Sequence, residues 1–152
     1  MSDFVTASHV FLDCNASTVD EALRFFADKA VELGCAGDAE AVYESFKARE
    51  AEGTTGMTGG FAIPHAKTSS VKDAVVLVAK FAEPIDWPSM DEKPVECAIA
   101  LLIPAAEAGT THLRLLSKIA VMLMDAHERE QMLTCNDAQK LASLVNEGVS
   151  ED

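Results

Sequence analysis

The stretch Gly59-Gly60-Phe61-Ala62-Ile63-Pro64-His65-Ala66 combines a glycine turn, a short apolar segment and a histidine that directly follows a proline. Proline fixes its own φ and favours extended geometry in the residue before it, so we expect a strand from Phe61 to Ile63 that ends at Pro64. His65 would then stand at a strand end, stiff in its backbone and open to solvent. Such a position suits a nucleophile that another macromolecule must reach, although an isolated Pro-His pair is equally compatible with an ordinary turn.

The composition is that of an acidic, folded domain. A chain of 152 residues is long enough to bury roughly 70% of the surface that it exposes when unfolded. It carries 12 Lys and Arg against 25 Asp and Glu, a net charge of −13, and 49% of its residues are hydrophobic. The charge argues against nucleic acid as a partner, because phosphate contacts need clustered basic side chains. A basic protein partner would instead be attracted.

The cysteines and the apolar segments indicate the cellular compartment in which we expect the protein. Four cysteines are scattered without a Cys-x-x-Cys pair, and the first residues do not resemble a secretory leader, so we expect reduced thiols and a cytoplasmic protein. The longest apolar segment, residues 95–106, contains Glu96 and Pro104 and is too short to cross a bilayer, so we expect no membrane insertion. Cys97 within it is interpreted as a small core residue.

The first half of the chain predicts a strand followed by two helices. Residues 9–12 have the pattern of a strand. Thr18 with Glu21 is a capping-box pattern, and it opens a helix that should end at Gly34. A second helix is expected from residue 38 to about residue 50, before the loop that leads to His65.

The second half predicts two more strands and three helices. Residues 74–81 and 95–103 read as strands buried on both faces, joined by a connection that Trp87 anchors. A long helix should follow residue 109, then two short helices and a frayed tail at about residues 148–152. The expected apolar stripe of the long helix is Leu113, Leu116, Ala120, Leu123 and Met124. Strands and helices interleave over residues 1–152, so the sequence predicts a single α/β layered domain.

Four groups could converge on one site: Arg49, the loop at residues 54–58, His65 and His112. A threonine at a helix N-cap would place His112 in the first turn, where free N–H groups and the helix dipole favour an anion. A guanidinium, threonine hydroxyls and helix-start amides match the oxygens of a phosphoryl group. A neutral imidazole can attack phosphorus near neutral pH without a separate base. These residues predict phosphoryl transfer.

Each of these residues also has an ordinary structural explanation. Arg49 could be a surface charge at a helix end, the loop a simple turn, and His112 a helix-start residue without a role. His9 and His127 belong to no motif, and we interpret both as structural or exposed. The combination of the four groups is more informative than any one of them.

Several segments together resemble a known family. They are Gly60-Phe61-Ala62-Ile63-Pro64-His65-Ala66-Lys67-Thr68, Arg49-Glu50, Thr54-Thr55-Gly56-Met57 and Thr111-His112-Leu113-Arg114-Leu115-Leu116. Along nearly its whole length the chain resembles the IIA domain of the bacterial phosphoenolpyruvate-dependent sugar phosphotransferase system, of the fructose–mannitol family. The connection at residues 86–91 is similar to the fructose-type version. The resemblance implies a mixed β-sheet flanked by helices, with no metal and no organic cofactor.

The resemblance also implies a reaction and its partners. His65 would accept a phosphoryl group from phosphohistidine on the small carrier HPr and donate it to a cysteine of a IIB domain. IIB would then phosphorylate a sugar that enters through a membrane IIC component. His112 would neighbour the phosphorylated ring and assist transfer. The residues expected to hold the phosphoryl group are Arg49, Thr54, Thr55 and Thr111.

Two positions depart from the family pattern, and two alternatives stay open. Thr54 replaces the usual serine and keeps its hydroxyl, whereas Thr58 replaces the usual glycine and would cost about 1 kcal/mol or more if φ were positive there. A regulatory module of the same fold, like the nitrogen-related members, would be phosphorylated on His65 but act by binding proteins. A metal-binding hydrolase built on His65 and His112 would need a third ligand and a carboxylate base that cannot be assigned.

Overall fold

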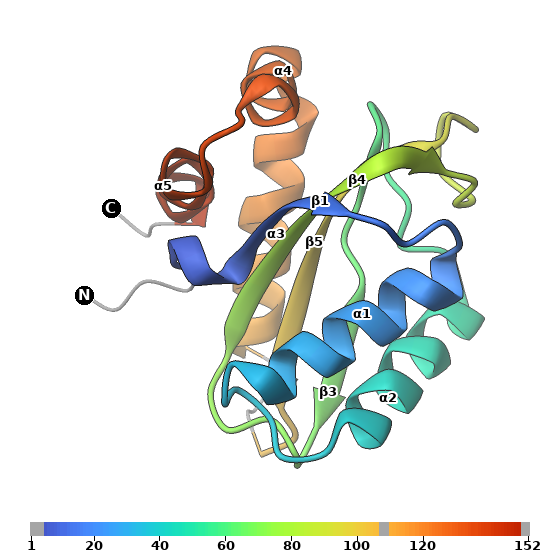
Figure 1. Cartoon of the computed structure of the whole chain (residues 1–152), viewed down its shortest axis with the longest axis vertical. Coiled ribbons are helices and arrows are strands. Elements are labelled where there is room, and N and C mark those ends of the chain that lie inside the picture. The colour runs from blue at the N-terminus through green and yellow to red at the C-terminus, as the bar shows by residue number, and fades with distance from the viewer. Residues whose placement is uncertain (1–4, 107–109, 150–152) are drawn as a thin grey trace.

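The structure, a computed structural model, describes residues 5–106 and 110–149, and the side chains of residues 110–112 are not described. It shows a mixed β-sheet flanked by helices, as predicted (Figure 1). In chain order the elements are η1 (Ala7–His9), β1 (Val10–Cys14), α1 (Val19–Glu32), α2 (Ala39–Glu52), β2 (Phe61–Ala62), β3 (His65–Thr68), β4 (Val75–Ile85), β5 (Val95–Pro104), α3 (Thr110–Met124), α4 (Ala126–Thr134) and α5 (Ala138–Val149).

The sheet places β5 between β4 and a broken edge strand. β1 pairs parallel with β4, β4 pairs antiparallel with β5, and both β2 and β3 pair parallel with β5. Phe61 lies opposite Cys97 and His65 lies opposite Leu101, so β2 and β3 lie end to end along β5. Pro64 interrupts them because it has no N–H to donate, although its carbonyl still accepts from Leu101 N at 2.9 Å. The predicted strand does end before Pro64, whereas the second strand that begins at His65 was not predicted.

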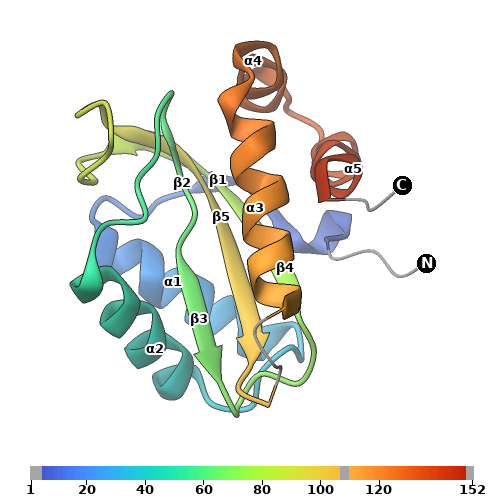
Figure 2. The same ribbon diagram turned by 180° about the vertical axis from the view of Figure 1, so that it is seen from behind.

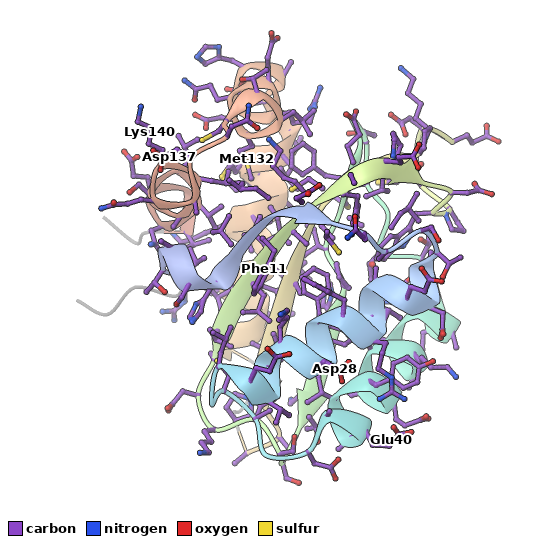
Figure 3. The ribbon with its side chains drawn as sticks, viewed as in Figure 1. Phe11, Asp28, Glu40, Met132, Asp137 and Lys140 are labelled. Carbon is purple, nitrogen blue, oxygen red and sulfur yellow. The ribbon has the colours of Figure 1, made fainter. Side chains whose placement is uncertain are left out.

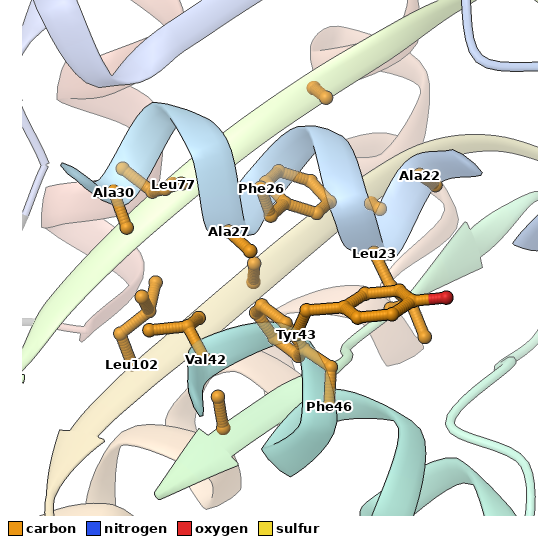
Figure 4. Close-up of a cluster of buried hydrophobic side chains, with 14 of the residues drawn as sticks. Ala22, Leu23, Phe26, Ala27, Ala30, Val42, Tyr43, Phe46, Leu77 and Leu102 are labelled. Atoms are coloured by element: carbon orange, nitrogen blue, oxygen red, sulfur yellow. The ribbon is translucent and has the colours of Figure 1, made fainter. Parts of the chain in front are cut away.

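Two hydrophobic cores lie on the two faces of the sheet. α1 and α2 cover one face, and α3 and α5 cover the other (Figures 1 and 2). Successive residues of β4 alternate between them, with Leu77 facing α1 and α2 and Val76 facing α3 and α5. Figure 4 shows part of the first core, including Phe26 and Phe46. The centroids of these two rings are 6.2 Å apart. Both strands predicted as buried on two faces are confirmed.

The helix caps follow the sequence pattern closely. Thr18 Oγ1 accepts from Glu21 N at 3.1 Å and opens α1. The Glu21 carboxylate reaches one residue further back than a standard capping box and accepts from Ser17 N at 2.9 Å. Gly34, with φ +77°, follows the end of α1 in the left-handed conformation. Asp38 caps α2 by accepting from two backbone N–H groups of the first turn.

The buried face of α3 is not the stripe that the sequence suggested. Leu113 and Met124 are 63% and 77% exposed. Leu123 is buried as expected, whereas Leu116 is only partly buried. The side chains of α3 that are buried are Leu115, Ile119, Met122 and Leu123. Apolar residues surround most of this helix, so helical spacing fits more than one face, and only packing on the sheet selects one.

The last helix runs further than expected. α5 passes Gly148, whose φ is not positive, and reaches Val149, which is 3% exposed. A Cβ at Gly148 would lie 2.3 Å from Met122 Sδ, so this glycine permits close packing on α3 instead of ending the helix. Residues 148 and 149 are therefore folded, contrary to the expected frayed tail, while residues 150–152 lie outside the described residues.

Trp87 and Cys97 are buried, as the sequence predicted. Trp87 is 2% exposed and anchors the connection after β4. The four cysteines, all within the described residues, form no disulfide. Cys97 is fully buried in β5, and burial raises the pKa of its thiol to about 12 because it disfavours the thiolate. None of the helices that the structure describes is long and apolar enough to cross a bilayer.

Candidate functional site

His65 is the first residue of β3, on the edge of the sheet beside α2 (Figure 2). It is only 7% exposed, so the expectation of a solvent-open side chain was wrong. The physical reason is that the residue after Pro64 is not in an open turn but begins a second strand, which pairs with β5 on one side and lies beside α2 on the other. Because His65 pairs with Leu101, its side chain lies on the face of the sheet that α3 covers.

A pocket of about 240 Å³ lies beside His65. The C-terminal half of α2 forms one wall, and β3 with the end of β5 forms the other. The lining residues are Ser45, Ala48, Arg49, Glu52, His65, Ala66, Lys67 and Ile103. Arg49 and Lys67 bring two positive charges and Glu52 one negative charge, so this pocket is locally cationic in a chain of net charge −13. The structure thus brings Arg49 and His65 together around a place suited to an anion.

Arg49 lies in the last turn of α2 and is half-buried. Its Nη1 donates to the carbonyl of Gly53 at 2.8 Å, which satisfies backbone at the end of the helix. A guanidinium has five N–H donors, so this bond leaves other donors that can meet an anion in the pocket. The side chain therefore both caps the helix and lines the site.

The hydroxyl groups of Thr54 and Thr55 are bonded within the protein. Thr54 Oγ1 donates to Pro88 O at 2.5 Å and accepts from Gly56 N at 3.0 Å. Thr55 is 5% exposed and donates its hydroxyl hydrogen to the carboxylate of Glu50. A hydroxyl has a single hydrogen to donate. In this arrangement both threonines fix the loop, and neither hydroxyl has a hydrogen left to donate to a phosphoryl oxygen.

The glycine turn before β2 accommodates Thr58 without strain. Positive φ falls on Gly59 (+72°) and Gly60 (+87°), and Glu92 is the only described residue other than glycine with positive φ. The backbone cost considered for Thr58 therefore does not arise. A Cβ at Gly59 would lie 2.2 Å from Nε of Arg129, which packs on this turn from α4. Sequence reasoning missed Arg129, because no local pattern connects α4 with this loop.

The connection at residues 86–93 holds the same loop from another side. Asp91 accepts from Gly59 N at 3.0 Å and also from Ser89 Oγ and Lys93 N, each at 3.2 Å. These bonds favour the charged carboxylate and lower the pKa of Asp91, with the Gly59 bond as the largest cause. A Cβ at Gly56 would lie 2.1 Å from Pro88 O, so the two segments are in direct backbone contact.

The other predicted site residues, Thr111 and His112, lie at the start of α3. The backbone of Thr111 and His112 is in the first turn of α3, which packs on the same face of the sheet as His65, but their side chains are not described. Their roles stay predictions. His9 and His127 do not line the pocket, and His127 is exposed. Within the described ranges, no three His, Cys, Asp or Glu side chains come together as a metal-binding group.

Comparisons with a family model, with curated sequences and with solved structures all point to one family. Residues 3–148 match the family model of the phosphoenolpyruvate-dependent sugar phosphotransferase system, EIIA 2. The chain is 38% identical over 133 residues to a fructose-specific EIIA component from Haloferax volcanii, covering 88% of this chain and 86% of that protein. It is 34% identical over 145 residues to a nitrogen regulatory protein from Bradyrhizobium diazoefficiens, covering 95% and 94%. The crystal structure of the nitrogen regulatory protein IIA-Ntr from Neisseria meningitidis superposes with a TM-score of 0.86 at 29% identity, covering 93% and 96%.

Proposed function

Since the chain belongs to the EIIA 2 family of the phosphoenolpyruvate-dependent sugar phosphotransferase system, we propose that it is a cytoplasmic phosphocarrier phosphorylated on His65. The donor is phosphorylated HPr, and the acceptor is a cysteine of a IIB domain that works with a membrane IIC component. Uptake of a fructose-type sugar is the process served. The observation that carries the proposal is the placement of His65 in a cationic pocket beside Arg49.

The chemistry needs only the histidine and an anion-stabilising environment. A neutral ring nitrogen of His65 attacks the phosphorus of the donor phosphohistidine, so one P–N bond forms while the donor's P–N bond breaks. The electron pair of the broken bond returns to the donor ring. Transfer onward reverses the roles, since the IIB thiolate forms a P–S bond and His65 leaves as neutral imidazole. Such transfers depend on alignment and on stabilising charge at the phosphoryl oxygens.

The lining residues suggest how the phosphoryl group is held. Arg49 and Lys67 offer positive charge beside the imidazole, and the first turn of α3, with Thr111 and His112, offers helix-start amides on the same face of the sheet. Direct contact from Thr54 or Thr55 would require their hydroxyls to leave their present acceptors. In our proposal these two threonines act mainly by fixing the loop.

The surface suits a basic donor protein. Exposed carboxylates include Asp28 on α1, Glu40 on α2 and Asp137 just before α5 (Figure 3). Because His65 is largely buried, the donor must seat closely over the pocket to bring its phosphorus within reach. Charge attraction would raise the rate of encounter and orient the partner before that contact forms.

A regulatory role is the second candidate. It is favoured by the 34% identity to a nitrogen regulatory protein and by the superposition on IIA-Ntr. The same histidine would be phosphorylated, but the output would be binding of a target protein instead of transfer to IIB. The two functions therefore share their first step and differ in the second.

The first step is tested by incubating the protein with phosphoenolpyruvate, enzyme I and HPr, followed by intact-mass measurement before and after acid treatment. We expect one acid-labile phosphoryl group in the wild type and in His127→Ala, a control at an exposed histidine, and none in His65→Ala. No gain of mass with active HPr would overturn the phosphocarrier proposal. Transfer from the phosphorylated protein to a purified IIB would then favour transport, and its absence would favour regulation.

A further inference from the structure

We infer that Glu50 is a positioning residue for His65, acting through Thr55 and the backbone that leads to the histidine. The inference rests on the proposed function and adds to it a side chain that does not line the pocket. Glu50 follows Arg49 in the last turn of α2, and its carboxylate is part-buried. Three links connect it with the reactive ring.

The first link is a pair of hydrogen bonds from one threonine to one carboxylate. Glu50 Oε2 accepts from Thr55 N at 3.2 Å, and Oε1 accepts from Thr55 Oγ1. Thr55 is 5% exposed, so water competes little for these bonds. Hydrogen bonds to an ionised acceptor are about twice as strong as neutral ones, so this pair holds the loop firmly on the end of α2.

The second link runs from the loop to the strand. Thr55 O accepts from Ile63 N at 3.0 Å, and Met57 N donates to Phe61 O at 2.7 Å. Gly56 and Ala62 form an antiparallel bridge between these two bonds. Residues 55–57 therefore run antiparallel to residues 61–63, which lead directly into Pro64 and His65.

The third link is the strand itself. Pro64 cannot donate to a neighbour, so the backbone entering His65 is anchored by Ile63 N on the loop side and by Leu101 N, which donates to Pro64 O, on the β5 side. Loss of the loop contact would leave one of these two anchors. The position of the imidazole therefore depends on Thr55, and Thr55 depends on Glu50.

The consequence concerns the geometry between the cation and the nucleophile. Arg49 and Glu50 share one helical turn, so the chain of contacts ties the part of α2 that carries Arg49 to the backbone that leads to His65. A second tie, between Ser45 Oγ and the backbone of Lys67 at 2.8 and 3.1 Å, holds the later part of β3 to α2. Misplacement of reacting groups by about 1 Å can reduce a rate by as much as 10²-fold.

The test compares Glu50→Gln and Thr55→Val with a conservative rescue variant, Thr55→Ser, and a control, Glu44→Gln. Thr55→Ser keeps the hydroxyl, and Glu44→Gln removes an exposed carboxylate from the same helix. With phospho-HPr as donor, we expect kcat for acceptance to fall about 10- to 100-fold in Glu50→Gln and Thr55→Val, with KM little changed because neither residue lines the pocket. The double variant should lose less than the product of the two single effects, because both substitutions weaken the same link. Thr55→Ser should recover most of the rate that Thr55→Val loses, and Glu44→Gln should match the wild type.

A second measurement follows the ring directly. In the unphosphorylated protein with ¹⁵N-labelled histidine, the imidazole signals of His65 should shift in the same direction in Glu50→Gln and Thr55→Val, shift less in Thr55→Ser, and stay unchanged in Glu44→Gln. Phosphoramidate, which releases ammonia as its P–N bond breaks, serves as a donor that needs no protein docking. Circular dichroism checks that each variant is folded.

The outcomes separate the two proposals. If the wild type is phosphorylated and Glu50→Gln matches it in kcat and in ring signals, the positioning role is overturned while the phosphocarrier function stands. If the wild type accepts nothing from phospho-HPr or phosphoramidate, the proposed function fails. The ring signals alone then decide whether Glu50 positions His65.

Discussion

Replacing Gly56 with alanine would test the contact that holds the site loop on the connection after β4. An ideal Cβ at this position lies 2.1 Å from Pro88 O and 2.9 Å from Ser89 Cα. Both are backbone atoms, so no side-chain rotation can relieve the overlap. The loop and the connection must move apart, and the hydrogen bond from Thr54 to Pro88 O lengthens as they do.

The expected cost follows from these two effects. Overpacking against a rigid neighbour costs about 1–3 kcal/mol. Weakening of the Thr54 bond adds about 0.5–1.5 kcal/mol. We therefore expect the free energy of unfolding to fall by about 1.5–4.5 kcal/mol, which for a chain of this size lowers Tm by roughly 3–18 °C. The loop shift should also slow phosphoryl acceptance, because the loop pairs with the segment before His65.

Thermal unfolding followed by circular dichroism measures the change, with Gly37→Ala as the matched control. A Cβ at Gly37 meets nothing within 4 Å, and its φ is not positive, so this variant should unfold at nearly the wild-type temperature. Equal Tm values for the two variants would refute the close contact. A large loss of stability with an unchanged acceptance rate would instead refute its relevance to the site.

Four further measurements probe the site and the core. Arg49→Ala should slow phosphoryl acceptance about 10- to 100-fold by removing charge stabilisation, with partial recovery in Arg49→Lys, and a wild-type rate would contradict a role for the guanidinium. His112→Ala should still be phosphorylated but should transfer poorly to IIB, so normal onward transfer would argue against its assistance. Acceptance from phospho-HPr should slow as ionic strength rises above ~0.15 M, whereas a salt-independent rate would mean that apolar contacts dominate docking. The pKa of Cys97 is raised from 9.0 to about 12 in the folded state, so between these pH values the native protein keeps a proton that the unfolded chain releases. The free energy of unfolding should therefore fall as pH rises from about 9 to about 12. Urea titrations at several pH values should show a smaller fall in Cys97→Ala, and an equal fall would refute the shift.

Much of this protein is readable from its sequence, because the signals act over a few residues. Thr18, Gly34 and Asp38 mark helix ends through hydrogen bonds or backbone angles within one turn. The apolar runs that became β4 and β5 need burial on both faces, whatever covers them. The motif around His65 identified the family, since a histidine after a proline and a glycine turn is a local pattern.

Tertiary structure decided the features that depend on distant segments. A second strand, β3, forms after Pro64 because β5 offers an edge on which it can pair, and His65 is buried within that arrangement. Packing on the sheet determines which face of α3 is buried. Close contact with Met122 leaves no room for a side chain at Gly148. Arg129 and Glu50 contact the loop before β2 only in the folded chain, at Gly59 and Thr55 respectively. Local sequence determines which backbone conformations have low free energy. Strand register and side-chain burial depend instead on which surfaces pack together, and those contacts form only when the whole chain has folded.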